Sequence, residues 1–298
     1  MFRLRENKKT IKYLLISIVL LTFVQILLGA AVRLTQSGLS CPDWPLCYGM
    51  VFPTFSNFTE LNVDNFTYFQ VMLEWIHRFN AAFLIGPLIL MVFFIINFNK
   101  KQNNDLFKLS YILLFLLLVQ GLLGGLTVFQ FNSPWSVAIH LSFAFILFGF
   151  LLFMLKKVIT RKDIDSIFFV VPKGKKKYIF ISVVITLITS VAGAFTSKYG
   201  ASLACSSWPL CNKGSFLISD SFELIHYSHR ILGVLLFSSL VLMLIKIYPY
   251  IKNIRNKIKN ILLLILLVFF CQVFIGAMLI VYSVPVWMGI FHQSIGLT

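Results

Sequence analysis

The stretch ILLLILLVFFCQVFIGAMLIVY, residues 261–282, contains no charged side chain and a single amide, Gln272. A helix needs about 20 consecutive apolar residues to cross the hydrocarbon core of a bilayer, and this stretch is long enough to do so. Seven further segments have a similar composition, at about 11–33, 70–97, 107–129, 135–156, 177–197, 222–247 and from 286 to the end. The pattern predicts an all-α polytopic membrane protein with eight transmembrane helices.

The composition agrees with a lipid environment. The chain is 59% hydrophobic and 12% charged, whereas soluble domains carry about 25% charged residues. Its net charge of +16 comes from basic residues between the apolar segments, not from a basic patch interleaved with aromatic side chains. A nucleic-acid partner is therefore not expected. The lipid bilayer is the expected surrounding, and the sequence leaves open whether the chain forms an oligomer.

The basic residues also predict the orientation. Most of the 26 Lys and Arg residues lie at the amino terminus and in every second connection between spans. Basic connections face the cytoplasm in multi-pass proteins, so we expect both termini to be cytoplasmic in a bacterial cell membrane. The last apolar segment has only about 13 residues, too few to cross a bilayer. We therefore expect the eighth helix to be truncated in this sequence.

The chain contains an internal repeat. The segment CPDWPLC at 41–47 matches CSSWPLC at 205–211 at five of seven positions, and His77-Arg78 recurs as His229-Arg230. Each half holds four spans, so both halves have the same orientation and the repeat is parallel, not inverted. We therefore expect two four-helix bundles, residues 1–160 and 161–298.

Four histidines form the main candidate site. They lie near the outer ends of the even-numbered spans, and the two histidines of each half are 63 residues apart, at His77 and His140 and at His229 and His292. An ionisable residue inside a membrane is costly and indicates function. Two imidazoles at matched depth in an apolar bundle suit the axial positions of a heme iron. Contacts between helices are the structural alternative, and zinc fits less well because a third ligand is missing.

The two halves differ beside these histidines. Glu74 lies three residues before His77 on the same helical face, and His226 takes its place in the second half. A carboxylate there could move a proton or stabilise a developing cation. The first half is therefore expected to be reactive and the second to be a plain cofactor site.

Arginines and small residues accompany the histidines. Arg78 and Arg230 directly follow two of them, and each could bind a heme propionate or an outer-loop carboxylate. Gln120 and Gly124 recur as Gln272 and Gly276. Glycine lets a flat macrocycle or another helix approach the backbone closely, so these positions suit either a cofactor or helix packing.

The cysteines of the outer loops are expected to form local disulfides. Oxidising conditions outside the membrane permit them, and the pairs would be Cys41 with Cys47 and Cys205 with Cys211. A structural staple is the simplest interpretation of both pairs. A redox role stays open for the first pair because it shares a half with Glu74. Cys271 lies within a span and is expected to pack there.

These motifs resemble the bacterial heme A synthase family. The resemblance rests on GAAVRLTQSG at 29–38, CPDWPLC at 41–47 and EWIHRFN at 74–80, and the regions of His140, His229 and His292 extend it over nearly the whole chain. It implies an eight-helix enzyme that oxidises the C8 methyl group of heme O to a formyl group, giving heme A for terminal oxidases.

The resemblance also assigns roles to residues. It places the substrate heme O between His77 and His140, with Glu74 near the reacting methyl group, and a resident heme b between His229 and His292. It implies delivery of heme O by a heme O synthase and an electron acceptor or donor that the sequence does not identify. The alternatives are a bis-histidine b-type cytochrome that takes electrons from quinol, or a heme carrier. Glu74 favours the enzyme because neither alternative requires an acid on one side only.

Overall fold

The computed structural model describes residues 2–60, 65–98, 104–159, 171–211, 218–251 and 256–297. Regular secondary structure in these ranges is helical, apart from an isolated bridge between Cys47 and Met50. Seven helices within them are long and apolar enough to cross a membrane, at 8–34, 68–98, 105–129, 134–159, 173–198, 221–250 and 260–281. The all-α, multi-pass class is confirmed, and these seven helices coincide with the first seven predicted spans.

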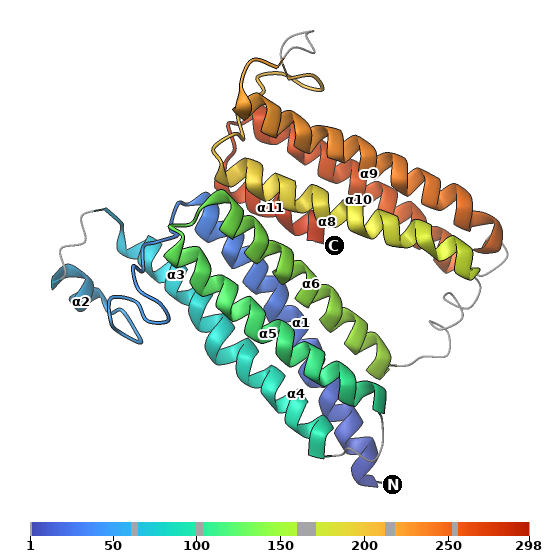
Figure 1. Cartoon of the computed structure of the whole chain (residues 1–298), viewed down its shortest axis with the longest axis horizontal. Helices are drawn as coiled ribbons and strands as arrows, with labels where there is room; N and C mark the ends of the chain where they lie inside the picture. The colour runs from blue at the N-terminus through green and yellow to red at the C-terminus, as the bar shows by residue number, and fades with distance from the viewer. Residues whose placement is uncertain are drawn as a thin grey trace. The chain divides into compact units, whose positions relative to one another are not determined.

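The chain divides into two compact units, residues 1–160 and 161–298. In the first unit, α1 packs against α4 and α6, and α5 packs between α4 and α6 (Figure 1). The second predicted span consists of α3, a π-helical segment η1, and α4, and α1 also contacts the first two of these. The helices of this unit are α1 (Phe2–Leu34), α2 (Phe55–Glu60), α3 (Tyr68–Phe79), η1 (Asn80–Ile85), α4 (Gly86–Phe98), α5 (Asn104–Phe129) and α6 (Pro134–Ile159).

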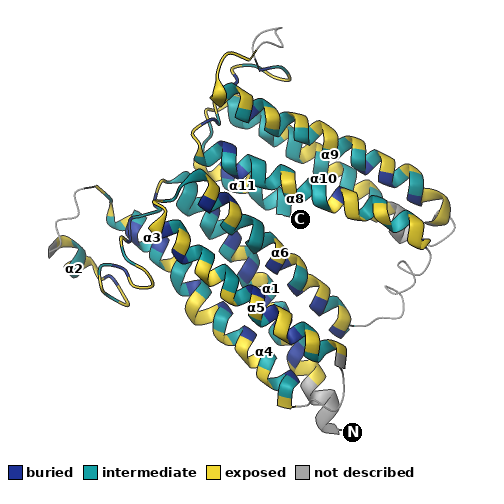
Figure 2. Cartoon of the chain, in the orientation of Figure 1, coloured by how far each residue is buried: buried dark blue, intermediate teal, exposed yellow. Residues whose placement is uncertain are grey.

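The aliphatic core of this unit lies toward one end of the helices. Fully buried Leu15, Ile89, Leu113 and Leu151 interdigitate there from α1, α4, α5 and α6. The candidate histidines lie toward the other end, where polar and small residues line the same helices. Exposed positions, yellow in Figure 2, occur along the helices. Many of them are large apolar residues, as expected for helices that face lipid.

The π-helical segment follows His77 by three residues and has a local cause. Pro87 has no backbone N–H, and its ring would clash with the carbonyl one turn earlier in a regular helix. The backbone N–H of Gly86 instead donates to the carbonyl of Ala81, five residues back. Such bulges are frequent at functional sites, and this one places Asn80 in the buried interior.

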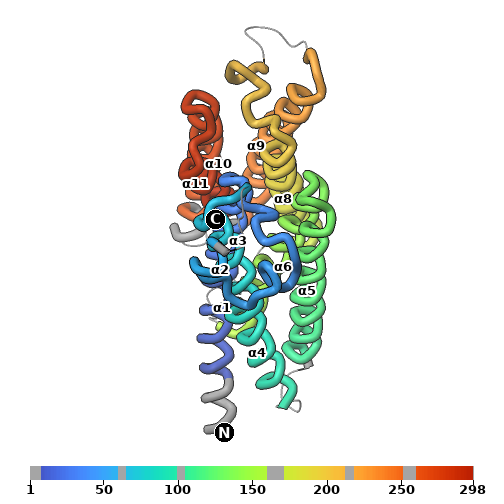
Figure 3. The backbone as a smooth tube through the Cα atoms, turned by 90° about the vertical axis from the view of Figure 1, so that its left-hand side faces the viewer, coloured from blue at the N-terminus to red at the C-terminus, as the bar shows by residue number. Residues whose placement is uncertain are grey.

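The second unit contains η2 (Lys173–Lys175), α8 (Lys176–Lys198), α9 (Ser221–Ile251), α10 (Asn256–Val281) and α11 (Val286–Leu297). Helix α8 packs along α9, and α10 packs against both α9 and α11 (Figure 3). Val171, Leu240, Met243 and Ile247 form its buried apolar cluster. Helix α11 carries His292 and has 12 residues, so it is not among the seven candidate spans.

Backbone details recur between the units at the spacing of the sequence repeat. The turn after α1 has a positive φ at Gln36, and the turn after α8 has one at Gly200. Phe131 and Asn132 in the turn after α5 match Ser283 and Val284 after α10, again with positive φ. The peptide bonds before Pro45 and Pro209 are both cis. The outer turns of the two units therefore share their local geometry.

Candidate functional site

Each candidate histidine packs against a glycine of the preceding membrane helix. A Cβ atom built on that glycine would lie 2.8 to 3.3 Å from the Cε1 atom of the ring, closer than side chains normally approach. The pairs are Gly29 with His77, Gly124 with His140, Gly193 with His229, and Gly276 with His292. The repeated glycines therefore allow four imidazole rings to lie directly against a neighbouring backbone.

Gly193 is the tightest of these positions, so Gly193→Ala is expected to displace the His229 ring. Its Cβ would lie 2.8 Å from Cε1 and 3.2 Å from Nε2. Overpacking of this kind costs about 1–3 kcal/mol. Gly233→Ala on α9 is the matched control, because nothing lies within 4 Å of its Cβ and alanine favours a helix. Thermal unfolding in detergent measures both, and equal midpoints would contradict the expectation.

A glutamine lies one turn before three of these glycines and contacts the histidine opposite. The Gln25 Nε2 atom donates to the His77 backbone carbonyl at 2.9 Å and lies 3.1 Å from the ring Nδ1. Gln120 makes the same two contacts with His140, at 3.2 and 3.3 Å, and Gln272 Nε2 lies 3.2 Å from His292 Nε2. The sequence analysis missed Gln25, although its spacing to Gly29 equals that of Gln120 to Gly124.

The donor set of the first unit fits a heme. His77 on α3 and His140 on α6 are held against neighbouring helices in the same unit. The described residues contain no cluster of three or more His, Cys, Asp or Glu side chains suited to a bare metal ion. A porphyrin supplies its own four nitrogen ligands and needs only axial imidazoles from the protein. Histidines held against glycine backbones satisfy that need.

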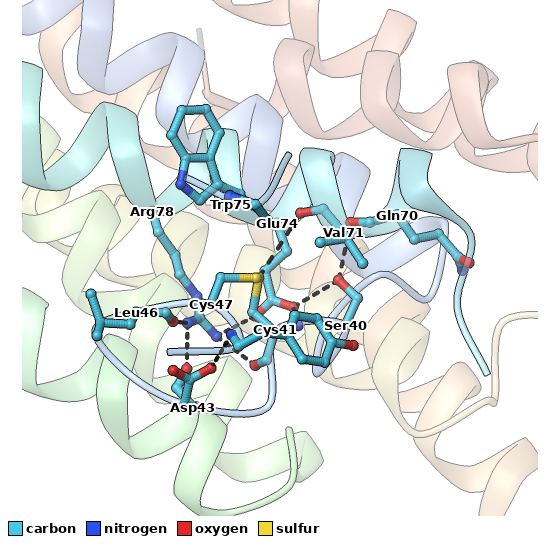
Figure 4. Close-up of a disulfide and its surroundings, with 12 residues drawn as sticks. Ser40, Cys41, Asp43, Leu46, Cys47, Gln70, Val71, Glu74, Trp75 and Arg78 are labelled. Carbon is cyan, nitrogen blue, oxygen red and sulfur yellow. Dashed lines mark hydrogen bonds and ion pairs between the residues drawn. A yellow bond between two sulfur atoms is a disulfide. The ribbon is translucent and has the colours of Figure 1, made fainter. Parts of the chain in front are cut away.

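Glu74 is buried and fully engaged with the first disulfide loop. Its Oε1 accepts from Arg78 at 2.8 Å, and its Oε2 accepts from the backbone N–H of Cys41 at 2.9 Å and from the Ser40 hydroxyl at 3.0 Å (Figure 4). The carboxylate lies on α3, one turn before His77. It therefore connects the helix that carries a candidate ligand to the disulfide loop.

Both candidate arginines bind the carbonyls of a disulfide loop. Arg78 donates to the carbonyls of Cys41, Asp43 and Leu46. Arg230 makes the equivalent contacts in the second unit, with the carbonyls of Ser207, Pro209 and Leu210. These two arginines thus hold the disulfide loops onto the second and sixth spans, and their assignment to heme propionates stays a prediction.

The predicted disulfides are present. Cys41 pairs with Cys47, and Cys205 pairs with Cys211, all four being buried. Within the first loop, the Trp44 ring packs against Gly125 of α5, since a Cβ there would lie 3.2 Å from the indole. Gly125 directly follows Gly124, the glycine that contacts His140, so the loop packs against the helix that also holds the His140 ring. Cys271 is a free, exposed thiol on α10, so the expectation that it packs inside was wrong.

In the second unit, His226 stands at the position of Glu74. Its ring Nδ1 lies 2.9 Å from the carbonyl of Ala201, in the turn after α8. An imidazole therefore links the helix to this turn where the first unit uses a carboxyl group. His226 is buried, and this contact gives it a structural role separate from the histidine that follows one turn later.

Comparison with known proteins matches residues 12–298 to the COX15-CtaA family model, described as a cytochrome oxidase assembly protein. A heme A synthase of Flavobacterium psychrophilum is 26% identical over 97% of this chain and 94% of its own length. One of Shewanella oneidensis is 29% identical over 92% of this chain and 88% of its own length. One of Macrococcus caseolyticus is 31% identical, covering 78% and 74% of the two chains.

Proposed function

Because this chain belongs to the COX15-CtaA family of cytochrome oxidase assembly proteins, we propose that it is a heme A synthase, oxidising the C8 methyl group of heme O to a formyl group. The relatives that carry this name align along nearly its whole length. The observation that carries the proposal is the asymmetry of two otherwise similar histidine sites. Among the described residues, only the first of them has a buried carboxylate, Glu74, one turn from a candidate ligand.

The two sites hold different hemes in this proposal. His77 and His140 in the first unit bind the substrate heme O, and His229 and His292 in the second bind a resident heme b. The resident heme would supply an electron-transfer centre when bound. The glycines opposite the four rings support this assignment, since the close contact fixes where each imidazole lies before it meets iron.

Glu74 is the proposed catalytic residue. Oxidation of a methyl group to a formyl group adds one oxygen atom, which water would supply, and releases protons and the electrons that the acceptor takes, and positive charge can develop at the reacting carbon. A buried carboxylate such as Glu74 stabilises such charge or accepts a proton. The hydrogen bonds from Ser40 and Cys41 and the ion pair with Arg78 keep Glu74 in one orientation.

The membrane arrangement is part of the proposal. We infer eight spans in two parallel-repeat four-helix bundles, with both termini in the cytoplasm of a bacterial cell and the disulfide loops outside. The positive-inside rule supports this orientation. A heme O synthase would deliver the substrate, and a redox partner of the membrane would take the electrons removed.

A direct assay tests the function. Purified protein is incubated with heme O and an electron acceptor, and the extracted hemes are analysed by mass. A heme synthase is expected to yield the formyl product and any alcohol formed on the way. A b-type cytochrome or a heme carrier would return heme O unchanged, which would refute the proposal while leaving both histidine sites intact.

A further inference from the structure

The glutamines that contact the histidines compete with iron. A neutral imidazole has one nitrogen with an available lone pair, and that pair can either accept a hydrogen bond or bind a metal. Gln25 Nε2 lies 3.1 and 3.3 Å from the two ring nitrogens of His77. Gln120 Nε2 lies 3.3 and 3.5 Å from those of His140. Donation by the amide and ligation of iron therefore exclude each other at the same atom.

The glutamine amide keeps a hydrogen-bond acceptor when iron takes the ring nitrogen of the histidine. Gln25 and Gln120 also donate to the backbone carbonyl of the same histidine, at 2.9 and 3.2 Å. Asn80, in the π-helical segment, donates to Gln25 Oε1 at 2.8 Å and holds the amide in place. A buried donor that keeps one acceptor avoids most of the penalty of an unsatisfied polar group. The Gln25 amide therefore keeps hydrogen-bond partners whether or not iron binds the His77 ring.

The second unit lacks this arrangement at one of its two histidines. Thr189 stands one turn before Gly193, where the other three helices carry glutamine. Its hydroxyl donates to the carbonyls of Ile185 and Leu232, not to the His229 ring. Nδ1 of His229 is buried without a hydrogen-bond partner among the described residues. Only His292 faces a glutamine in this unit.

We propose that Gln25 and Gln120 are positioning residues for substrate exchange, giving both ligands of the first unit an alternative partner that speeds heme release. Thr189, whose hydroxyl is directed at backbone carbonyls and donates nothing to the His229 ring, keeps the heme of the second unit resident. The proposal rests on the proposed function, because only an enzyme whose substrate and product are hemes needs one exchangeable site beside a retained one.

Heme transfer to an excess of apomyoglobin tests this, using the full-length protein in detergent loaded with heme at both sites. Wild type is expected to release heme in a fast and a slow phase, and His77→Ala should remove the fast one. Gln25→Leu and Gln120→Leu should each slow the fast phase by about 2- to 10-fold, the equivalent of one hydrogen bond. Thr189→Gln should accelerate the slow phase by a similar factor.

Gln130→Leu is the matched control, since Gln130 is exposed in the turn after α5 and its substitution should leave both phases unchanged. A low-spin spectrum in each loaded variant would show that both axial ligands are retained. Thr189→Gln adds a hydrogen-bond donor near His229, so this variant tests the proposal by introducing the amide that the other three helices carry. Unchanged or faster release in either glutamine-to-leucine variant, or no acceleration by Thr189→Gln, overturns the proposal. Failure of the proposed function is seen separately, as wild-type protein that leaves heme O unconverted.

Discussion

Glu74→Gln is expected to lower the conversion of heme O by about 100-fold or more, a typical loss when a charge-stabilising or proton-accepting group is removed. The substitution keeps the size of the side chain and removes its charge. The proposed resident heme of the second unit should remain at full occupancy, because Ser40, Cys41 and Arg78, the hydrogen-bond partners of Glu74 among the described residues, belong to the first unit. Product analysis by mass and the heme spectrum of the same preparation measure the two effects.

Glu74→Gln could also lower activity by destabilising the fold, and Arg78→Gln is the control for that effect. Arg78, Ser40 and the Cys41 N–H all donate to the Glu74 carboxylate. In Glu74→Gln the new side-chain N–H₂ would therefore face another donor, which lowers stability. Arg78→Gln also weakens the anchoring of the loop but leaves the carboxylate in place. If Glu74 only holds the loop, the two variants should lose stability and activity together. Wild-type turnover per folded molecule in Glu74→Gln would refute the catalytic role.

His229→Ala and His292→Ala are each expected to abolish the low-spin heme spectrum of the second unit. Loss of one axial imidazole removes a direct bond to iron, which no neighbouring group replaces in a bis-histidine site. His226→Ala is the matched control, because His226 is buried on the same helix as His229 but faces the carbonyl of Ala201. It should lower stability and keep the heme.

The measurement is the reduced-minus-oxidised spectrum, with heme quantified per folded protein after size-exclusion chromatography. Substitution in the first unit, such as His140→Ala, should leave the resident heme unaffected because each unit supplies its own pair of histidines. Full heme retention in both His229→Ala and His292→Ala would show that the ligands lie elsewhere. Loss of the heme in His226→Ala alone would assign the axial ligand to His226, one helical turn before His229.

The sequence by itself determined the membrane class, the positions of seven spans and the candidate histidines. Charged groups are so costly in hydrocarbon that uncharged runs of about 20 residues mark spans without any knowledge of packing. The repeat made the histidines recognisable, because an identical separation of 63 residues in both halves is not expected of residues that merely pack. The disulfide pairs followed from their short spacing within outer loops, and the structure confirms them.

Only the tertiary structure decided which groups touch these histidines. Periodicity places Gly29 and Gln25 on one face of a helix, but the rotation and depth of that helix decide whether the face meets His77. The same holds for Arg78, which follows a candidate ligand in sequence and yet turns to the carbonyls of the disulfide loop. Lateral contacts between helices depend on packing in three dimensions, and a one-dimensional pattern records only the spacing along each helix.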